Sequence, residues 1–323
     1  MIWLTWRQHR RQVWFTLAAL AALAALMVPT GLSMWGAFDD LKLGDCLARI
    51  PTAPADPAEA MPCSTALTNF RSSYQTMNLV GVLMLFLPLL IGLFWGAPLV
   101  AREIEHGTHR FAWTQGVSRR RWMLVKFGLV GAATLTASVA YGLGMSWWLT
   151  PLARAGQSRM NLVAFDMQGI VPIGYTLFAV ALGVFAGTVW PKVLPAMAAT
   201  LVGVIGLRIV LTTLARRHYQ PAEAVTFPVV GATDSNPAAG DWVLGRGVRD
   251  ASGRMVIPGI QVGCPSDAPG CAAELGLGDG AYNWLLLQPA ERFWLFQTIE
   301  FGIYAALAVV LLALAMRRVR RIA

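Results

Sequence analysis

Residues 72–101 read SSYQTMNLVGVLMLFLPLLIGLFWGAPLVA and contain no Asp, Glu, Lys or Arg. A helix needs about 20 mostly apolar residues to cross a bilayer, so this stretch is long enough to span a membrane. The composition of the whole chain also fits a membrane protein, since its 323 residues are 56% hydrophobic and only 13% charged, whereas globular domains are roughly 25% charged. This composition excludes a soluble globular, a disordered and a disulfide-dense secreted protein.

Five further apolar stretches are long enough to span a membrane. They are residues 12–38, 127–153, 167–191, 193–215 and 293–316. Three of the five carry no charge, whereas Arg208 lies within the fifth span and Glu300 within the sixth. The pattern predicts an all-α polytopic membrane protein with six transmembrane helices, so both termini lie on one side of the membrane.

Basic residues gather on the side of the termini. The N-terminus, the 102–126 loop, Lys192 and the C-terminal tail hold 14 basic and two acidic residues, and the rest of the chain holds 12 basic and 15 acidic residues. The positive-inside rule places the basic side in the cytoplasm. Orientation and contact with the lipid bilayer therefore explain the net charge of +9, and a nucleic-acid partner is not needed.

The four cysteines, Cys46, Cys63, Cys264 and Cys271, all fall on the opposite side, in two long polar loops. Disulfides persist outside the cytosol, so this placement supports the same orientation. Cys46–Cys63 and Cys264–Cys271 are the pairings nearest in sequence, although four cysteines allow three connectivities. Unpaired thiols and a soft metal site are the alternatives.

The predicted organisation has four parts. They are an interfacial elbow helix at 1–13, spans one to five at 14–215 with an extracellular loop at 37–78 and a cytoplasmic coupling loop at 101–126, a small extracellular α/β domain at 216–291, and the sixth span with a basic cytoplasmic tail at 292–323. Within the extracellular domain, residues 242–248 and 254–257 flank Asp-Ala-Ser-Gly, a pattern typical of a β-hairpin. The Pro-rich residues 39–63 are predicted to be irregular, and apolar residues at helical spacing predict a short helix over 67–77.

Two predicted spans carry small residues at regular spacing. In the third span they recur every fourth position, at Gly128, Ala132, Thr136, Ala140 and Gly144. In the fourth span Ala179, Gly183 and Gly187 share one helix face. Faces of small residues let helices approach closely in lipid, so we expect both spans to pack within a bundle.

The first cytoplasmic loop, residues 101–126, reads AREIEHGTHRFAWTQGVSRRRWMLVK. Gly107 can end an extension of the second span, Thr108 can cap a short helix over 109–114, and Ser118 can cap the third span. A short helix that projects into the cytosol is suited to docking in a partner's groove. The alternative is a connector that rests on lipid headgroups.

This loop resembles the signature of the type-2 ABC transporter permease family, in which an acid and Gly-Thr follow the second span and Val-Ser-Arg and a Lys begin the third. The matching residues are Glu103 or Glu105, Gly107, Thr108, Val117, Ser118, Arg119 and Lys126, with Gly116 where the family usually has Pro. The opening residues 3–10 resemble the elbow helix of the family, and residues 288–300 resemble its lead into the last span.

The resemblance implies a permease subunit of an exporter in a bacterial plasma membrane. The partners implied are a second permease copy and two copies of a separate ABC ATPase subunit, which would hold ATP and Mg. The residues expected to contact the ATPase are Glu103, Glu105, His106, Gly107, Thr108, His109, Arg110, Phe111 and Trp113. The expected cargo is amphipathic: an antibiotic, a lipid or a peptide.

By analogy with the family, four side chains of the second span could line a hydrophobic transport path. They are Met84, Phe86, Phe94 and Trp95. Core packing or contact with lipid is the alternative role for each of them.

No catalytic residue, cofactor or metal is predicted in this chain. A P-loop needs Gly-Lys-Ser/Thr to hold phosphates, and the three lysines follow Leu41, Val125 and Pro191. The acids and histidines of residues 103–109 lack both the His-Glu-x-x-His motif and its inverse, which disfavours an intramembrane metalloprotease.

Arg208 and Glu300 are each about seven residues from the outer end of their spans, so both lie about 10 Å below the outer interface. Charges inside a membrane are costly unless they are paired or exposed to water. We therefore predict that Arg208 and Glu300 form an intramembrane ion pair or jointly line the outer exit, with direct contact to substrate as the alternative. Two other functions remain open: an ion-coupled secondary transporter and a non-transporting membrane sensor subunit.

Overall fold

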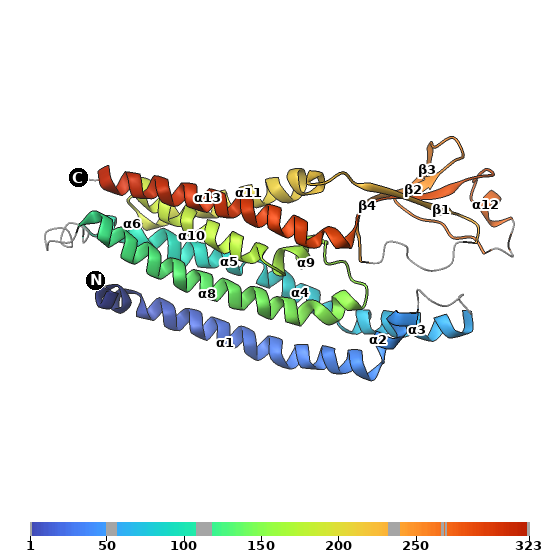
Figure 1. The fold of residues 1–323 in the computed structure, drawn as a ribbon, viewed down its shortest axis with the longest axis horizontal. Helices are drawn as coiled ribbons and strands as arrows, with labels where there is room; N and C mark the ends of the chain where they lie inside the picture. Colours follow the sequence, from blue (N-terminus) through green and yellow to red (C-terminus); the bar gives the residue numbers. More distant parts are fainter. Residues whose placement is uncertain are drawn as a thin grey trace.

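The structure is a computed structural model that describes residues 2–49, 57–107, 118–231, 240–265, 268 and 270–321. Long helices run side by side as a bundle, with a small sheet at one end and both termini at the other (Figure 1). We call the end that carries the four strands the sheet end, and the end that carries Ile2 and Arg321 the terminal end.

Six helical stretches of the described chain are long and apolar enough to cross a membrane, which confirms the predicted number. They are Val13–Asp40, Gln75–Glu105, Arg121–Arg154, Val171–Val189, Val193–His218 and Ala290–Arg321. The first lies within α1 (Ile2–Asp40), the third within α8 (Arg119–Arg154), and the fourth is α10 (Val171–Val189). Because α1 is one helix from Ile2 onward, the predicted elbow at 1–13 forms its first turns, and its interfacial position stays a prediction.

The other three spans are assembled from several helical pieces. The second comprises α4 (Gln75–Met84), α5 (Leu87–Ile91), the π-helix η1 (Gly92–Gly96) and α6 (Ala97–Glu105). The fifth comprises α11 (Val193–Val210), the π-helix η2 (Leu211–Ala215) and the 3₁₀-helix η3 (Arg216–His218). The sixth comprises the 3₁₀-helix η4 (Ala290–Arg292) and α13 (Phe293–Arg321).

The helix α10 is the centre of the bundle. In its most apolar part 78% of the residues are buried, compared with 11% in the first span and 17% in the fifth. It contacts α13, α6, η1, α11 and α8. A helix surrounded in this way needs no polar face, which explains why α10 carries no charged residue.

Glycines bring α10 against the second span. A Cβ at Gly183 would lie 2.6 Å from the backbone nitrogen of Ala97, and one at Gly187 would lie 2.9 Å from that of Ala101. The small face predicted on the fourth span therefore packs as expected. In contrast, a Cβ at Gly128 of α8 would meet nothing within 4 Å, so this position of the third span faces away from the rest of the described chain.

Two further helices cover the sheet end beside α1. These are α2 (Leu43–Arg49) and α3 (Pro57–Ser73), which a disulfide joins through Cys46 and Cys63. The prediction that residues 39–63 are irregular is therefore wrong for most of this segment. Pro57 fits the first turn of α3 because its missing N–H has no intrahelical partner at that position. From the end of α3, the Arg71 guanidinium donates to the carbonyl of Ala155 just after α8.

The sheet is four-stranded and antiparallel, in the order β1-β4-β2-β3, and lies between the fifth and sixth spans. The strands are β1 (Glu223–Pro228), β2 (Trp242–Arg249), β3 (Met255–Pro258) and β4 (Tyr282–Gln288). The predicted hairpin of β2 and β3 is confirmed. Its turn is closed by Asp250, whose pKa lies below its usual value mainly because the Ser252 hydroxyl donates to the carboxylate.

A second disulfide, between Cys264 and Cys271, joins the segment after β3 to the short helix α12 (Cys271–Glu274). Both pairings are the ones nearest in sequence. Cys264 is fully buried beside Val229, Val248 and Leu277, which form a small core under the sheet. The sheet end therefore carries both disulfides of the described chain.

Candidate functional site

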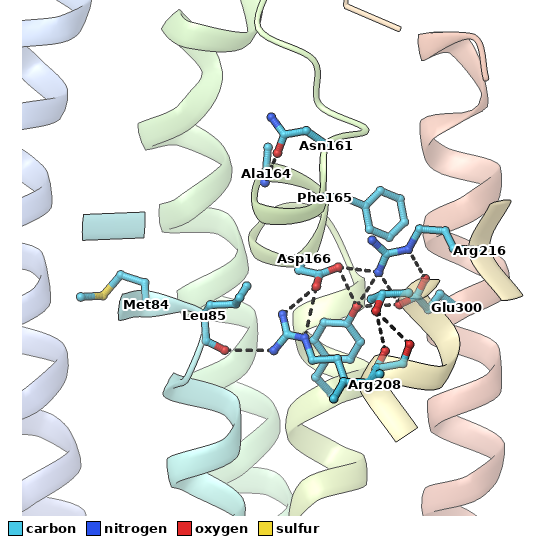
Figure 2. A network of polar contacts seen from close by, with 12 residues as sticks. Met84, Leu85, Asn161, Ala164, Phe165, Asp166, Arg208, Arg216 and Glu300 are labelled. Atoms are coloured by element: carbon cyan, nitrogen blue, oxygen red, sulfur yellow. Dashed lines mark hydrogen bonds and ion pairs between the residues drawn. The ribbon is translucent and has the colours of Figure 1, made fainter. Parts of the chain in front are cut away.

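Five polar side chains meet inside the bundle, and Figure 2 labels four of them, Asp166, Arg208, Arg216 and Glu300. We call them the charge cluster: Asp166, Tyr175, Arg208, Arg216 and Glu300. At most 3% of each residue is exposed except for Arg208, whose side chain is 20% exposed. Two guanidinium groups and two carboxylates balance in charge, which reduces the cost of burying them.

Asp166 enters the bundle on the short helix α9 (Leu162–Met167), which precedes α10. The helix begins at Asn161, whose side chain accepts a hydrogen bond from the Ala164 amide at 2.8 Å. Gly169 then adopts a left-handed conformation with φ of +69°, which lets the chain change direction before α10. Gln297 of α13 fixes this bend by accepting from the amides of residues 170 and 171 and donating to the carbonyl of residue 165.

The two arginines lie on the fifth span, on either side of the π-helix η2. In an uninterrupted α-helix, residues eight apart differ by about 80° around the axis, because each residue advances the helix by about 100°. A π-turn absorbs one extra residue, so Arg208 and Arg216 approach the alignment of residues seven apart, which differ by about 20°. Both can then reach Asp166: Arg208 Nη2 lies 2.7 Å from Oδ2, and Arg216 Nη2 lies 2.5 Å from Oδ1.

Glu300 of α13 completes the cluster. Arg216 donates to it twice, from Nε to Oε2 at 2.9 Å and from Nη2 to Oε1 at 2.7 Å. The Tyr175 hydroxyl of α10 lies 2.6 Å from Glu300 Oε1 and 2.9 Å from Asp166 Oδ1. Two parallel bonds between a guanidinium and a carboxylate fix the relative orientation of their helices.

Backbone and aromatic groups complete the surroundings of both arginines. Arg208 donates from Nη1 to the carbonyl of Leu85, between α4 and α5, at 3.1 Å. Its guanidinium carbon lies 4.8 Å from the ring centroid of Tyr175, and that of Arg216 lies 4.2 Å from the ring centroid of Phe165. The cluster therefore ties together α9, α10, α13 and the second and fifth spans.

The ion pairs differ from the single pair that sequence reasoning predicts. The carboxylate partner of Arg208 is Asp166, and the arginine partner of Glu300 is Arg216. Arg208 and Glu300 belong to one cluster, but they are connected through Asp166 and Tyr175. Counting depth along regular helices misses this arrangement, because η2 shifts the register of the fifth span and α9 brings an acid into the bundle.

Sequence reasoning missed Asp166 and Arg216 as members of the site. Arg216 was assigned to the extracellular domain, since it begins a polar run directly after the fifth span. A signal for Asp166 was present, because it is the only charged residue between Arg159 and Lys192. A lone acid in such a long apolar stretch marks an intramembrane site.

Exchanging the partners Asp166 and Arg208 should recover stability that each single charge reversal removes. Contacting charges typically show a coupling energy of about 0.5–3 kcal/mol in a double-mutant cycle. We expect the double variant to have a larger free energy of unfolding in mixed micelles than either single variant, Asp166→Arg or Arg208→Asp. The pair Arg208→Glu and Glu300→Arg serves as the control, and equal recovery there would contradict the assigned partners.

At the terminal end, the two acids at the start of the 101–126 loop contact two different spans. Glu103 forms an ion pair with Lys126 of α8, whose side chain is almost completely buried and lies over the Trp122 ring. Glu105 Oε2 accepts a hydrogen bond from the backbone nitrogen of Val193, the first residue of α11, at 3.0 Å. A carboxylate at a helix N-terminus also interacts favourably with the helix dipole.

The predicted ends of the neighbouring helices are confirmed. The helix α6 ends at Glu105, followed by Gly107 with φ of +67°. The Ser118 side chain caps α8 by accepting from the Arg121 amide at 3.3 Å. His106 is exposed. Other residues predicted to contact an ATPase lie outside the described chain: Thr108, His109, Arg110, Phe111 and Trp113.

The four side chains suggested for a transport path do not share one environment. Met84 and Trp95 are half-buried against separate apolar clusters of the bundle. Phe86 and Phe94 are 47% and 56% exposed. Their role in transport stays a prediction. Across the described ranges, no group of three His, Cys, Asp or Glu side chains could hold a metal ion.

Comparison with known families gives a match. A family model described as "ABC-2 membrane transporter related" matches residues 17–216. The matched region begins in α1 and ends at Arg216, so it includes spans two to four, nearly all of spans one and five, and every member of the charge cluster except Glu300. Comparison with the curated proteins and with the solved structures gives no match.

The match covers more than half of the chain, and the six membrane-spanning helices agree with it. Permeases related to this family typically lack an ATPase domain of their own. This chain belongs to the ABC-2 membrane transporter-related family of multi-pass membrane proteins.

Proposed function

We propose that this chain is the membrane subunit of an ATP-driven exporter in a bacterial plasma membrane. It would act as a dimer of permease chains, and two copies of a separate ATPase subunit would hold ATP and Mg. Membership of the family and the six spans support this function. The absence of a Gly-Lys pair from the sequence also supports an external ATPase, because a P-loop needs that pair to hold phosphates.

One observation carries the proposal: the base of the 101–126 loop is attached to three spans. Glu103 and Glu105 lie at the end of the second span, and their partners are Lys126 in the third and Val193 in the fifth. A force applied to this loop would therefore reach three membrane helices through short polar contacts. An ATPase docked on the loop could move all three, which is what coupling of ATP hydrolysis to transport requires.

The proposed orientation places the terminal end in the cytoplasm and the sheet end outside. Basic residues dominate the terminal end, including the tail with Arg317, Arg318, Arg320 and Arg321. The disulfides Cys46–Cys63 and Cys264–Cys271 lie at the sheet end, where an oxidising environment would preserve them. The proposed cargo is amphipathic, and its direction of transport is from the cytoplasm outward.

Glu105→Ala should uncouple the ATPase from the membrane subunit. Glu105 is exposed, and an exposed charged contact contributes at most about 1 kcal/mol, so we expect the permease-stimulated ATPase rate to fall by up to roughly fivefold. The measurement compares the ATPase alone with the ATPase in complex with each permease variant, in lipid vesicles. The ATPase would be the P-loop protein that copurifies with the tagged chain.

Arg102→Ala is the matched control, because Arg102 is exposed on the same turn of α6. It should leave the stimulated rate unchanged. Equal rates for Glu105→Ala and the unchanged chain would contradict the proposed coupling. Transport by the purified chain without any ATPase would indicate an ion-coupled carrier, and an ATPase complex that moves no cargo would indicate a sensor subunit.

A further inference from the structure

The fifth span links the base of the cytoplasmic loop to the charge cluster. Its α11 segment begins at Val193, whose amide donates to Glu105, and its last turns carry Arg208 and Arg216. The chain is helical without interruption from Val193 to His218. The same span is therefore held by polar contacts at both ends.

The sheet is attached to the bundle beside the charge cluster. β1 begins seven residues after Arg216, and β4 leads through η4 into α13, which carries Glu300. Polar contacts connect the two attachment segments, since Gln288 donates to the carbonyl of Gln220 at 2.7 Å and Arg292 donates to that of Pro221 at 2.7 Å. The Arg216–Glu300 pair therefore lies at the base of the sheet, between its entering and leaving chain segments.

The fifth span packs along the bundle between its two polar anchors. Half of its residues from Val193 to His218 are exposed, whereas Ala196, Thr200, Val204 and Leu211 are buried, and the span contacts α10, α6 and η1. Movement at its loop end would therefore pass along a packed helix to the end that carries Arg208 and Arg216. The π-helix η2 keeps Arg216 directed at the cluster, and a change of η2 into regular α-helix would rotate Arg216 by about 100° relative to Arg208.

We propose that the fifth span transmits movement of the cytoplasmic coupling loop to the charge cluster, and that the cluster sets the position of the sheet relative to the bundle. This proposal rests on the function proposed above. Asp166, Arg216 and Glu300 are positioning residues in this linkage: they hold the outer ends of three helices together. The sheet would then open or close the outer end of the bundle in step with the ATPase.

Spin labels on the sheet and on α3 would test this linkage in the full chain. Thr226→Cys in β1 and Asn69→Cys in α3 are both exposed positions, and the four native cysteines of the described chain are in disulfides. Electron paramagnetic resonance gives the distance distribution between the two labels. Without any ATPase, we expect Arg216→Gln and Glu105→Ala each to broaden or shift this distribution.

Two control variants match the tested ones. Arg217→Gln changes the exposed neighbour of Arg216, and Arg102→Ala changes an exposed residue beside Glu105; neither should alter the distribution. Arg216→Lys keeps the charge but cannot donate two parallel hydrogen bonds as a guanidinium does. It therefore allows the distance between the labels to be measured if Arg216→Gln does not fold. A distribution unaltered by Glu105→Ala would overturn the proposal, and so would one unaltered by both Arg216 variants.

The complex with the ATPase gives the second arm of the test. We expect trapping with ATP and vanadate to shift the distance between the labels, and Arg216→Gln to abolish this shift while ATP hydrolysis continues. An unchanged shift in Arg216→Gln would overturn the linkage but leave the proposed exporter function intact. If no ATPase binds the chain, the exporter function fails, whereas the arm without ATPase still tests the linkage.

Discussion

Arg216→Met should destabilise the folded chain by about 3–5 kcal/mol, because removing one partner of a buried ion pair leaves the other charges uncompensated. Arg216 is only 1% exposed and contacts both Asp166 and Glu300. Without it, Glu300 would lose its guanidinium partner, and Asp166 would keep only that of Arg208. The free energy of unfolding can be measured by titration with sodium dodecyl sulfate in mixed micelles, followed by tryptophan fluorescence.

Two variants make this prediction specific. Arg217→Met changes an exposed residue of the same turn and should alter the free energy of unfolding by no more than about 0.5 kcal/mol. Combining Arg216→Met with Glu300→Gln removes one charge of each sign and should restore much of the loss. If Arg216→Met and Arg217→Met unfold alike, the cluster does not stabilise the bundle.

Gly183→Ala should destabilise the bundle by about 1–3 kcal/mol, the usual cost of inserting an extra carbon into a well-packed core. The new methyl group would lie 2.6 Å from the nitrogen of Ala97 and 2.8 Å from the carbonyl carbon of Gly96. Both are backbone atoms, so α10 and the second span would have to separate. The same unfolding titration measures the effect.

Gly128→Ala is the control for this substitution, since a Cβ there would meet nothing within 4 Å. Alanine is favoured over glycine inside helices by up to about 1 kcal/mol, so this variant should be neutral or slightly more stable. Both glycines lie within long membrane-spanning helices, and they differ in what a Cβ would contact. If both variants lost a comparable amount of stability, Gly183 would not be needed for the close approach of α10 and the second span.

The spans could be predicted from sequence because the bilayer imposes a length and a polarity on each one separately. Residues 72–101, for example, are long and apolar enough to span whatever their neighbours are. The helix ends at Gly107 and Ser118 were also predictable, because capping depends on residues only a few positions apart. The hairpin of β2 and β3 was predictable for the same reason, because its turn residues lie between two short strands.

The central strand β4 was not predicted, although it pairs with both β1 and β2. Its apolar run, Trp284-Leu285-Leu286-Leu287, resembles a buried helix segment as much as a strand. Only pairing with strands more than 30 residues away decides between the two. The helix α2 and the first part of α3 were missed for a related reason, since the prolines of 51–62 suggest irregular chain even though Pro57 begins a helix, whereas the end of α3 lies in the helix predicted over 67–77.

The number of spans, the side on which basic residues gather and the family to which the chain belongs could all be read from the amino-acid sequence. Each of these properties depends on composition or on short local patterns. Which charges meet is known only from the folded chain, because the pairing of Arg208 with Asp166 and of Arg216 with Glu300 depends on the extra residue of η2 and on the position of α9. Ion pairing requires contact within a few ångströms, and residues far apart in sequence reach that distance only through the packing of whole helices.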